Sequence, residues 1–344
     1  MTIRPVTLDA RPSTERANPE SYSQSPSPRS ETSCTPLEID ELVVNWHLTE
    51  ACNYRCGYCY AAWEREPDQR DVVRDDLATL RLVDALWHFF RPDNAANPLR
   101  KSIRWARLRL SIAGGEPMLY PRQVSMIARH AKALGMRVSL ITNGSRLPDD
   151  EQAMRELALS LDILGLSLDA FSEQRNQAIG RADSKGQCLS LPDLARKVAI
   201  ARLARPDLAV KINTVVNAIN VHDDLRLSLA QLRPNRWKVL RMLPVTGEDL
   251  IVSDQDFAAF VARHASMGAC MSVEDNQDMV ETYIMVDPQG RFFQNSSGRI
   301  GLYRYSKPIT AQNVELAFSG MRFSAAGFAA RYQANSLREH RLSA

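Results

Sequence analysis

Several features are scarce in this chain of 344 residues, and each scarcity excludes a class of protein. No apolar run approaches the roughly 18–20 residues that a membrane-spanning helix needs. The start of the chain lacks the basic-then-apolar pattern of a secretory signal. Net charge is only +3, from 43 basic and 40 acidic residues, so we expect no broad nucleic-acid-binding surface. Only seven basic residues are lysines, so each lysine position is informative.

The six cysteines are too unevenly placed for a disulfide framework. Three of them, Cys52, Cys56 and Cys59, fall within eight residues with the spacing C-x3-C-x2-C, directly after the first predicted strand. Unpaired, clustered cysteines indicate a metal site in a reducing compartment, which we expect to be the cytoplasm. Three thiolates on one tight loop suit a cubane iron–sulfur cluster, in which three ligands for four irons leave one iron open.

Two other interpretations of the cysteine loop stay open. A structural zinc site needs a fourth ligand, for which His47 or Cys34 is available, although no second C-x2-C pair accompanies the loop. Three buried free cysteines are the other alternative, which the polar, glycine-containing loop disfavours. Cys34, Cys188 and Cys270 lie apart from the loop. If the loop holds an iron–sulfur cluster, we expect these three to be free thiols.

Alternating strand and helix patterns predict an α/β fold. The β-rich runs lie at residues 42–48, 108–113, 137–142, 162–168, 208–216 and 237–243, and the amphipathic stretches at 76–90, 121–134, 151–160 and 191–203. Such alternation implies βαβ crossovers and a parallel sheet, as a doubly wound sheet or a barrel. In either case, chemistry gathers at the C-terminal ends of the strands.

The two ends of the chain depart from this pattern. Residues 1–38 hold six prolines and no hydrophobic periodicity, which predicts a disordered tail without the stripe of a membrane-binding helix. Residues 39–264 form the predicted barrel and end in a helix over 253–264. Residues 265–344 are irregular apart from a strand-like run at 282–286. We expect them to form an extension that covers the barrel mouth.

The ends of the next three strands resemble the radical S-adenosylmethionine (SAM) superfamily. They read Ala113-Gly-Gly-Glu-Pro117, Asn143-Gly-Ser145 and Ser167-Leu-Asp169, in the superfamily's order after the cysteine loop. The resemblance implies a partial (βα)6 TIM-like barrel with a [4Fe-4S] cluster on the three cysteines and SAM on the open iron. The two glycines would let the backbone approach a ligand closely.

The same resemblance implies which side chains bind SAM. Glu116 would face its ammonium group, and Ser167 and Arg181 its carboxylate. The alternative for Arg181 is an ordinary surface arginine at a helix end. The full implied set is Tyr58, Gly114, Gly115, Glu116, Asn143, Ser167 and Arg181.

A closer resemblance, from about residue 45 to about residue 331, is to the viperin family. It rests on the cysteine loop and on the stretches at 169–176, 179–181, 210–217, 235–239 and 274–277. Viperins convert a ribonucleoside triphosphate into its 3′-deoxy-3′,4′-didehydro analogue, a chain terminator for viral polymerases. The resemblance implies this reaction on CTP, UTP or GTP. A 5′-deoxyadenosyl radical takes the ribose 4′ hydrogen, the 3′ hydroxyl leaves as water, and a reductase or flavodoxin-type donor supplies electrons.

Strand periodicity independently predicts a cationic barrel interior. Alternate side chains share one face of a strand, so Lys211 lies with Asn213, Arg236 lies with Lys238, and Arg109 shares the polar face of a third strand. If the apolar faces pack on helices, three strands direct cations inward. Buried charge then calls for an anion such as a triphosphate. The alternative is an edge position that exposes these cations to water.

By resemblance, these positions match the triphosphate contacts of viperins. The implied contacts are Arg109, Lys211, Asn213, Arg236, Lys238 and, by a loose alignment, Arg331. Arg109 stands where a lysine is expected, which keeps the charge but changes the geometry. The Arg-Gly-Gly run and tryptophan-bearing tail expected of viperins are missing, so lid closure and base recognition do not carry over.

Tyr283 matches a viperin tyrosine that donates a proton or hydrogen atom. A half-buried strand tyrosine is its alternative role. Two rival functions are a radical SAM enzyme for a peptide or another small molecule, and a non-catalytic iron–sulfur nucleotide sensor. Near the C-terminus only Cys270 is present, which leaves no second cluster for a peptide-modifying enzyme, and the intact motifs argue against a sensor.

Overall fold

The computed structural model describes residues 35–331, except residues 62, 66–68, 246, 269 and 296–302. They belong to a compact unit that spans Thr35–Ala344, and the other unit, Met1–Cys34, lies outside the described residues. The predicted disordered tail therefore falls almost wholly outside them. Its last two residues belong to the first strand, which begins at Leu37.

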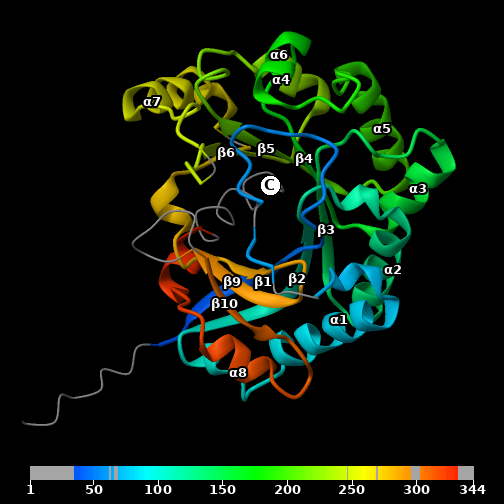
Figure 1. Cartoon of the computed structure of the whole chain (residues 1–344), viewed down its shortest axis with the longest axis vertical. Coiled ribbons are helices and arrows are strands. Elements are labelled where there is room, and N and C mark those ends of the chain that lie inside the picture. Colours follow the sequence, from blue (N-terminus) through cyan, green and yellow to red (C-terminus); the bar gives the residue numbers. More distant parts are fainter. Residues whose placement is uncertain are drawn as a thin grey trace, which may run out of the picture. The chain divides into compact units, whose positions relative to one another are not determined.

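A curved sheet organises the described part of the chain (Figure 1). Its strands are β1 (Leu37–His47), β2 (Ile103–Ala113), β3 (Arg137–Thr142), β4 (Ile163–Ser167), β5 (Ala209–Val216), β6 (Arg236–Arg241), β7 (Met271–Glu274), β8 (Ile284–Val286), β9 (Arg291–Asn295) and β10 (Tyr303–Pro308). The order is β10-β9-β8-β1-β2-β3-β4-β5-β6-β7. The run from β8 to β7 is parallel, and β9 and β10 add antiparallel strands. Among the described residues, β7 and β10 are the edges.

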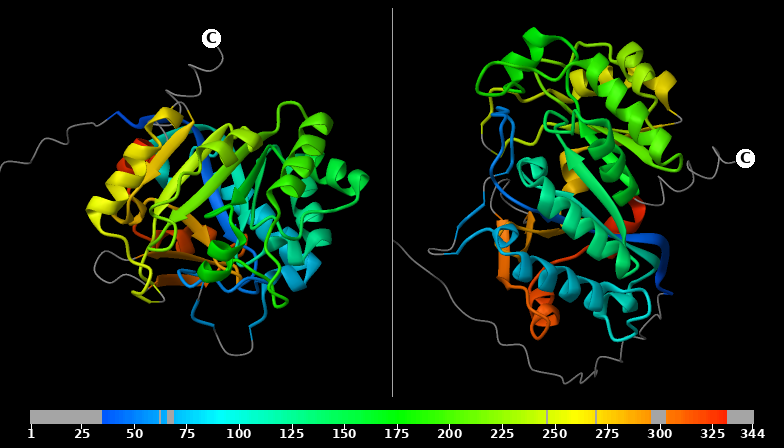
Figure 2. Two further views of the ribbon diagram at one scale, coloured as in Figure 1. Left: turned by 90° about the horizontal axis from the view of Figure 1, so that it is seen from above. Right: turned by 90° about the vertical axis from the view of Figure 1, so that its right-hand side faces the viewer.

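Helices cover the outer face of this sheet, as Figure 2 shows from two directions. They are α1 (Asp76–Phe90), α2 (Pro121–Ala133), α3 (Glu151–Ser160), α4 (Glu173–Ile179), α5 (Leu191–Ala204), α6 (Arg226–Leu232), α7 (Asp254–Arg263) and α8 (Val314–Ser319). Short 3-10 turns lie at Val72–Arg74, Pro98–Lys101, Pro117–Leu119, Ala265–Met267 and Asn276–Met279. No helix in the described ranges is long and apolar enough to cross a membrane.

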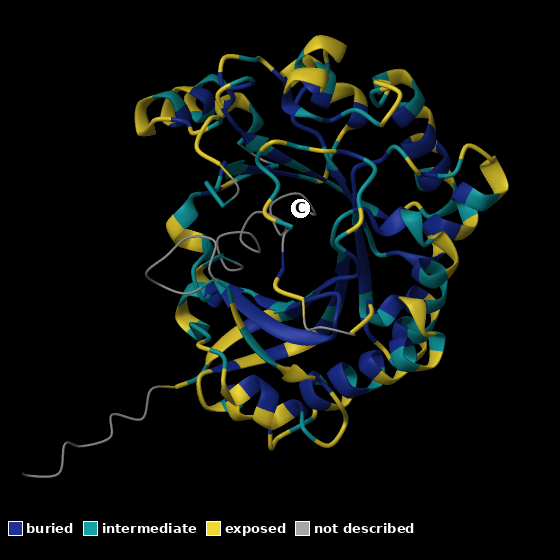
Figure 3. Ribbon diagram, in the orientation of Figure 1, coloured by how far each residue is buried: buried dark blue, intermediate teal, exposed yellow. Residues whose placement is uncertain are grey.

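Helix boundaries follow local capping signals. The Asp75 side chain caps α1 by accepting a hydrogen bond from the Ala78 N–H, and the Asp150 side chain caps α3 by accepting one from the Ala153 N–H. Gly180 ends α4 with a φ of 87°, a conformation that favours glycine. Buried residues lie between the helices and the sheet, and exposed ones on the outer helix faces (Figure 3).

The alternating pattern of β5 fixes which face lines the barrel. Val210 and Ile212 are fully buried, whereas Lys211 and Asn213 are partly accessible on the opposite, inner face. Trp237 on β6 is likewise fully buried. The six predicted strands and the mostly parallel sheet are therefore confirmed, and β8 lies within the predicted run at 282–286.

The structure adds strands that the sequence did not predict. In β9, four of five residues are buried, so its sequence shows no two-residue alternation. β8 pairs with β1, and β9 extends the sheet on that side. Phe318 of α8 packs against Phe90 and Phe292, with ring centroids 5.3 Å apart in each pair. This part of the extension therefore lengthens the barrel wall, and a cover over the mouth stays a prediction.

Candidate active site

The three clustered cysteines lie on the loop that follows β1. Cys52, Cys56 and Cys59 are partly buried, and all the described cysteines are free. No group of three or more His, Cys, Asp or Glu side chains in the described ranges could hold a single metal ion.

His47, one proposed zinc ligand, belongs to an aromatic cluster instead. Its ring centroid lies 5.2 Å from those of Trp63 and Phe293 and 5.9 Å from that of Tyr60. It is 3% exposed, and this burial lowers its pKa to about 4. Cys34, the other proposed zinc ligand, lies outside the described residues.

The Gly-Gly motif after β2 brings the cysteine loop and the sheet together. The Gly115 N–H donates to the Thr49 carbonyl at 2.6 Å, and the Glu116 N–H to the Ala51 carbonyl at 2.8 Å. A Cβ atom on Gly115 would lie only 2.2 Å from the Ala51 oxygen. Gly114, with φ of 136°, is equally confined by Thr49. In this structure the close approach that the glycines allow is therefore to the cysteine loop itself.

Gly180 anchors the same loop from another side. Its carbonyl accepts the Arg55 N–H at 3.0 Å, and the Ile179 carbonyl accepts the Gly57 N–H at 3.0 Å. A Cβ on Gly180 would meet the Arg55 carbonyl at 2.1 Å. The sequence analysis missed this role, because it predicted no helix over residues 173–179, which α4 occupies in the structure.

Glu116 joins the ends of two neighbouring strands. It is completely buried, and its carboxylate accepts hydrogen bonds from the Met118 N–H at 2.9 Å, the Thr142 hydroxyl at 2.6 Å and the Asn143 N–H at 2.7 Å. The Asn143 amide donates to the Asn53 side chain at 3.0 Å. Glu116 and Asn143 therefore lie beside the cysteine loop, and their contact with SAM stays a prediction.

Arg181 is buried next to the cysteines, so the surface alternative is wrong. Its guanidinium donates to the Asp169 carboxylate at 3.3 Å, to the Tyr58 hydroxyl at 3.1 Å and to the Ser167 carbonyl, and it lies 4.0 Å from the Cys56 sulfur. Burial raises the pKa of Cys56 to about 11, an effect that Arg181 opposes. Asp169 is a site residue that the sequence analysis quoted in a motif but did not assign.

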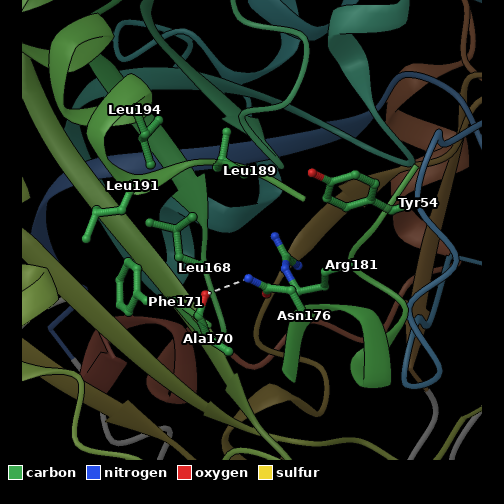
Figure 4. Close-up of a pocket in the computed structure, with 9 residues that line it drawn as sticks. All are labelled: Tyr54, Leu168, Ala170, Phe171, Asn176, Arg181, Leu189, Leu191 and Leu194. Carbon is green, nitrogen blue, oxygen red and sulfur yellow. Dashed lines mark hydrogen bonds between the residues drawn. The ribbon is translucent and has the colours of Figure 1, made fainter. Parts of the chain in front are cut away.

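A pocket beside Arg181 is shown in Figure 4. Its other lining residues are Tyr54, Leu168, Ala170, Phe171, Asn176, Leu189, Leu191 and Leu194. The pocket has room for about one water molecule, and Arg181 is already paired with Asp169, so the pocket alone is not a ligand site.

The inner faces of β5 and β6 carry the predicted cations side by side. Lys211 pairs in register with Arg236, and Asn213 with Lys238. Both strands have neighbours on each side, so the edge-strand alternative is wrong. Lys211 has no hydrogen bond or ion pair to any residue in the described ranges, and the buried Asn213 carbonyl oxygen accepts no hydrogen bond there. Burial, reinforced by neighbouring cations, lowers the pKa of Lys211 well below its usual range.

Arg109 is also inside but is paired. Its Nε lies 3.0 Å from Glu41, which also binds Arg137 at 3.1 Å. The sequence analysis did not identify Glu41. It lies four residues before Asn45 in β1, so both side chains are on the inner face of the strand.

A second carboxylate lies among the remaining cations. Glu274, at the end of β7, is 2.7 Å from Lys238 and accepts the Tyr283 hydroxyl at 2.5 Å. Arg331 lies 3.8 Å from Glu274 and stacks over the Tyr283 ring at 3.5 Å. The structure thus brings Lys238, Tyr283 and Arg331 together, and the roles that the resemblance implies for them stay predictions. The sequence analysis assigned no role to Glu274.

The sequence of this chain is similar to those of known proteins. The model of the radical SAM superfamily matches residues 46–216. The S-adenosylmethionine-dependent nucleotide dehydratase of Psychrobacter lutiphocae is 37% identical over 300 residues, or 86% of this chain and 96% of that protein. The protein of the same name from Pseudoalteromonas ulvae is 38% identical over 295 residues, or 86% and 94%. This chain belongs to their viperin-like family within the radical SAM superfamily.

A solved structure has the same fold. "Native anSMEcpe with bound AdoMet and Kp18Cys peptide" superposes with a TM-score of 0.56 and 15% identity, over 84% of each chain. Radical SAM enzymes use a [4Fe-4S] cluster and SAM, and the residues here fit both groups. Three free thiols share one loop, glycines hold that loop against the sheet, and the Arg181 guanidinium lies beside it.

Proposed function

We propose that this chain removes water from the ribose of a ribonucleoside triphosphate and forms its 3′-deoxy-3′,4′-didehydro analogue. The observation that carries the proposal is the cationic interior of the barrel. Among the described residues, basic side chains outnumber carboxylates there, an excess suited to a polyanion. The basic side chains are Arg109, Lys211, Arg236, Lys238 and Arg331, and the carboxylates are Glu41 and Glu274.

Lys211 and Asn213 are the strongest support, because their polar groups lack partners among the described residues. A buried polar group without a hydrogen bond costs free energy, and a buried charge costs more. A phosphate oxygen next to Lys211 would supply both the missing hydrogen bond and the opposite charge. Lys211 is partly accessible on the inner face, so a bound phosphate would take the place of water at its amino group.

We assign cofactor binding to the cysteine loop and its neighbours. We infer that Cys52, Cys56 and Cys59 hold the cluster and that Arg181 meets the SAM carboxylate. When bound, the two cofactors supply a 5′-deoxyadenosyl radical for removal of the ribose 4′ hydrogen. The phosphate-binding cations then orient the ribose so that this hydrogen faces the radical. Tyr283 donates a proton or hydrogen atom as the 3′ hydroxyl leaves as water.

The reaction also needs electrons and reduced thiols. We infer a reductase or flavodoxin-type protein as the electron donor. A cytoplasmic location would keep the cysteine thiols reduced before the cluster is assembled.

The test is anaerobic reconstitution followed by incubation with SAM, a reductant and ATP, CTP, GTP or UTP. We expect at least one triphosphate to stimulate SAM cleavage and to yield a nucleotide lighter by one water. The matching mono- and diphosphates are the controls and should react more slowly, because they meet fewer of the cations. Indifference to all four triphosphates would refute the proposed function.

A further inference from the structure

A carboxylate lies among the cations where the polyanionic triphosphate is proposed to bind. Glu274 is 5% exposed. A negative charge at such a site repels the substrate, and the repulsion is stronger in a buried environment than in water. Its position therefore calls for a function other than substrate binding.

The contacts of Glu274 indicate that function. One oxygen, Oε2, accepts the Tyr283 hydroxyl at 2.5 Å and lies 2.7 Å from the Lys238 ammonium. Lys238 also donates to the Tyr283 hydroxyl oxygen at 2.6 Å. The three polar groups come from different segments of the chain and form a closed triangle. Hydrogen bonds to charged groups are the stronger kind, so this triangle fixes the tyrosine hydroxyl.

The ring of Tyr283 is held separately by Arg331. The guanidinium lies 3.5 Å from the ring centroid and donates to the Thr282 hydroxyl at 2.9 Å. Arg331 also lies 3.8 Å from Glu274. Glu274 thus contacts both cations and the tyrosine hydroxyl.

Near neutral pH, Glu274 is ionised and Lys238 is protonated, so their ion pair is maintained. Burial raises the pKa of Glu274, but Lys238 and Arg331 outweigh that effect and lower it to about 2. Burial lowers the pKa of Lys238 to about 8, and Glu274 opposes this shift. The other titratable groups that act on Lys238 among the described residues are Arg236, Lys211 and Arg331. Since all three are basic, Glu274 is the acidic neighbour that keeps Lys238 protonated.

We propose that Glu274 is a positioning residue that holds the Tyr283 hydroxyl at a fixed place beside the phosphate-binding Lys238. The inference rests on the proposed function and deepens it. Glu274 does not itself contact the nucleotide; it acts through the two groups that do. Loss of Glu274 should therefore impair completion of the reaction after hydrogen abstraction and leave nucleotide binding largely intact.

The test uses the reconstituted enzyme and three variants. Glu274→Gln keeps the size and removes the charge, whereas Glu274→Asp keeps the charge and moves it. Glu315→Gln is the matched control, because Glu315 is exposed on α8. For each protein, nucleotide affinity is measured by equilibrium dialysis near pH 6.5, where Lys238 is protonated. The amounts of 5′-deoxyadenosine and dehydrated nucleotide are measured in the same reactions.

For Glu274→Gln we expect a nucleotide Kd within about threefold of the wild-type value and at least about tenfold less dehydrated nucleotide per 5′-deoxyadenosine. The alkaline fall of kcat/KM should begin at a lower pH, because the ammonium of Lys238 has lost its acidic neighbour. Glu274→Asp should restore that pH profile toward wild type. Glu315→Gln should match wild type in every measurement.

A wild-type product ratio in Glu274→Gln would overturn the inference. So would a Kd that rises as much as turnover falls, because that result assigns Glu274 to binding or to general stability. Absence of dehydrated nucleotide in the wild-type reaction would refute the proposed function, and the positioning role with it. The wild-type reaction alone distinguishes that failure from a failure of the positioning role.

Discussion

Gly115→Ala should prevent normal assembly of the iron–sulfur cluster. The added Cβ would lie 2.2 Å from the Ala51 oxygen, so that oxygen must move by about 1.2 Å to reach ordinary contact at 3.4 Å. Two hydrogen bonds flank this contact, from Gly115 to Thr49 and from Glu116 to Ala51. Their loss costs about 1–3 kcal/mol at about 0.5–1.5 kcal/mol each. Because Ala51 directly precedes Cys52, the first cluster ligand moves with it.

The assay is the iron and sulfide content per chain after anaerobic reconstitution, together with the thermal midpoint of the cluster-free chain. We expect Gly115→Ala to retain less than about half of the wild-type iron and to unfold several degrees lower, since about 1 kcal/mol shifts the midpoint by about 2–4 °C in domains of 150–250 residues. Gly247→Ala is the control, because nothing lies within 4 Å of its Cβ. Full iron content and an unchanged midpoint in Gly115→Ala would refute the reasoning.

Three further predictions concern the charged groups of the site. Lys211→Met should weaken triphosphate binding by about tenfold or more in equilibrium dialysis and should not lower the thermal midpoint, because Lys211 has no hydrogen bond or ion pair to another described residue; unchanged affinity would contradict its role. The value of kcat/KM for the nucleotide should fall as the pH rises through about 8, because Lys238 is charged below its pKa and neutral above it; a flat profile across that range would contradict this. Arg181→Lys should weaken SAM binding by about tenfold, since lysine lacks the planar fork that reaches Asp169, Tyr58 and Ser167 together. Nucleotide affinity should stay unchanged in Arg181→Lys, and equal loss of both ligands would contradict the assignment.

Local patterns in the sequence were sufficient to predict the barrel strands and the inward cations. In β5 and β6, apolar residues alternate with Lys211, Asn213, Arg236 and Lys238, and a two-residue period specifies opposite faces of a strand. The cysteine spacing is equally local. These features need no knowledge of what lies across the sheet.

The partners of these groups depend on the tertiary fold. Glu274 meets Tyr283 and Lys238 only because β7 pairs with β6 and the segment before β8 passes nearby. Glu41 likewise contacts Arg109 and Arg137 through the register of neighbouring strands. The members of such pairs lie on different segments of the chain, so strand periodicity cannot identify them. It indicates only the face of the strand on which a residue lies.

The backbone contacts of the glycines were hidden for a similar reason. The Gly-Gly motif was expected to let the backbone approach a ligand, which stays a prediction, and the structure adds that Gly115 closely approaches the Ala51 carbonyl of the cysteine loop. A glycine in a sequence shows that something approaches closely but does not identify it. β9 was missed because both of its faces are buried, which removes the alternation.

Deuterium transfer from the substrate tests the central claim most directly. A ribonucleoside triphosphate that carries deuterium at the ribose 4′ carbon is incubated with the reconstituted enzyme, SAM and a reductant, and both products are analysed by mass spectrometry. The account predicts one deuterium in 5′-deoxyadenosine and a nucleotide that has lost that deuterium and one water. Unlabelled 5′-deoxyadenosine, or a nucleotide that keeps its 4′ deuterium, would contradict it.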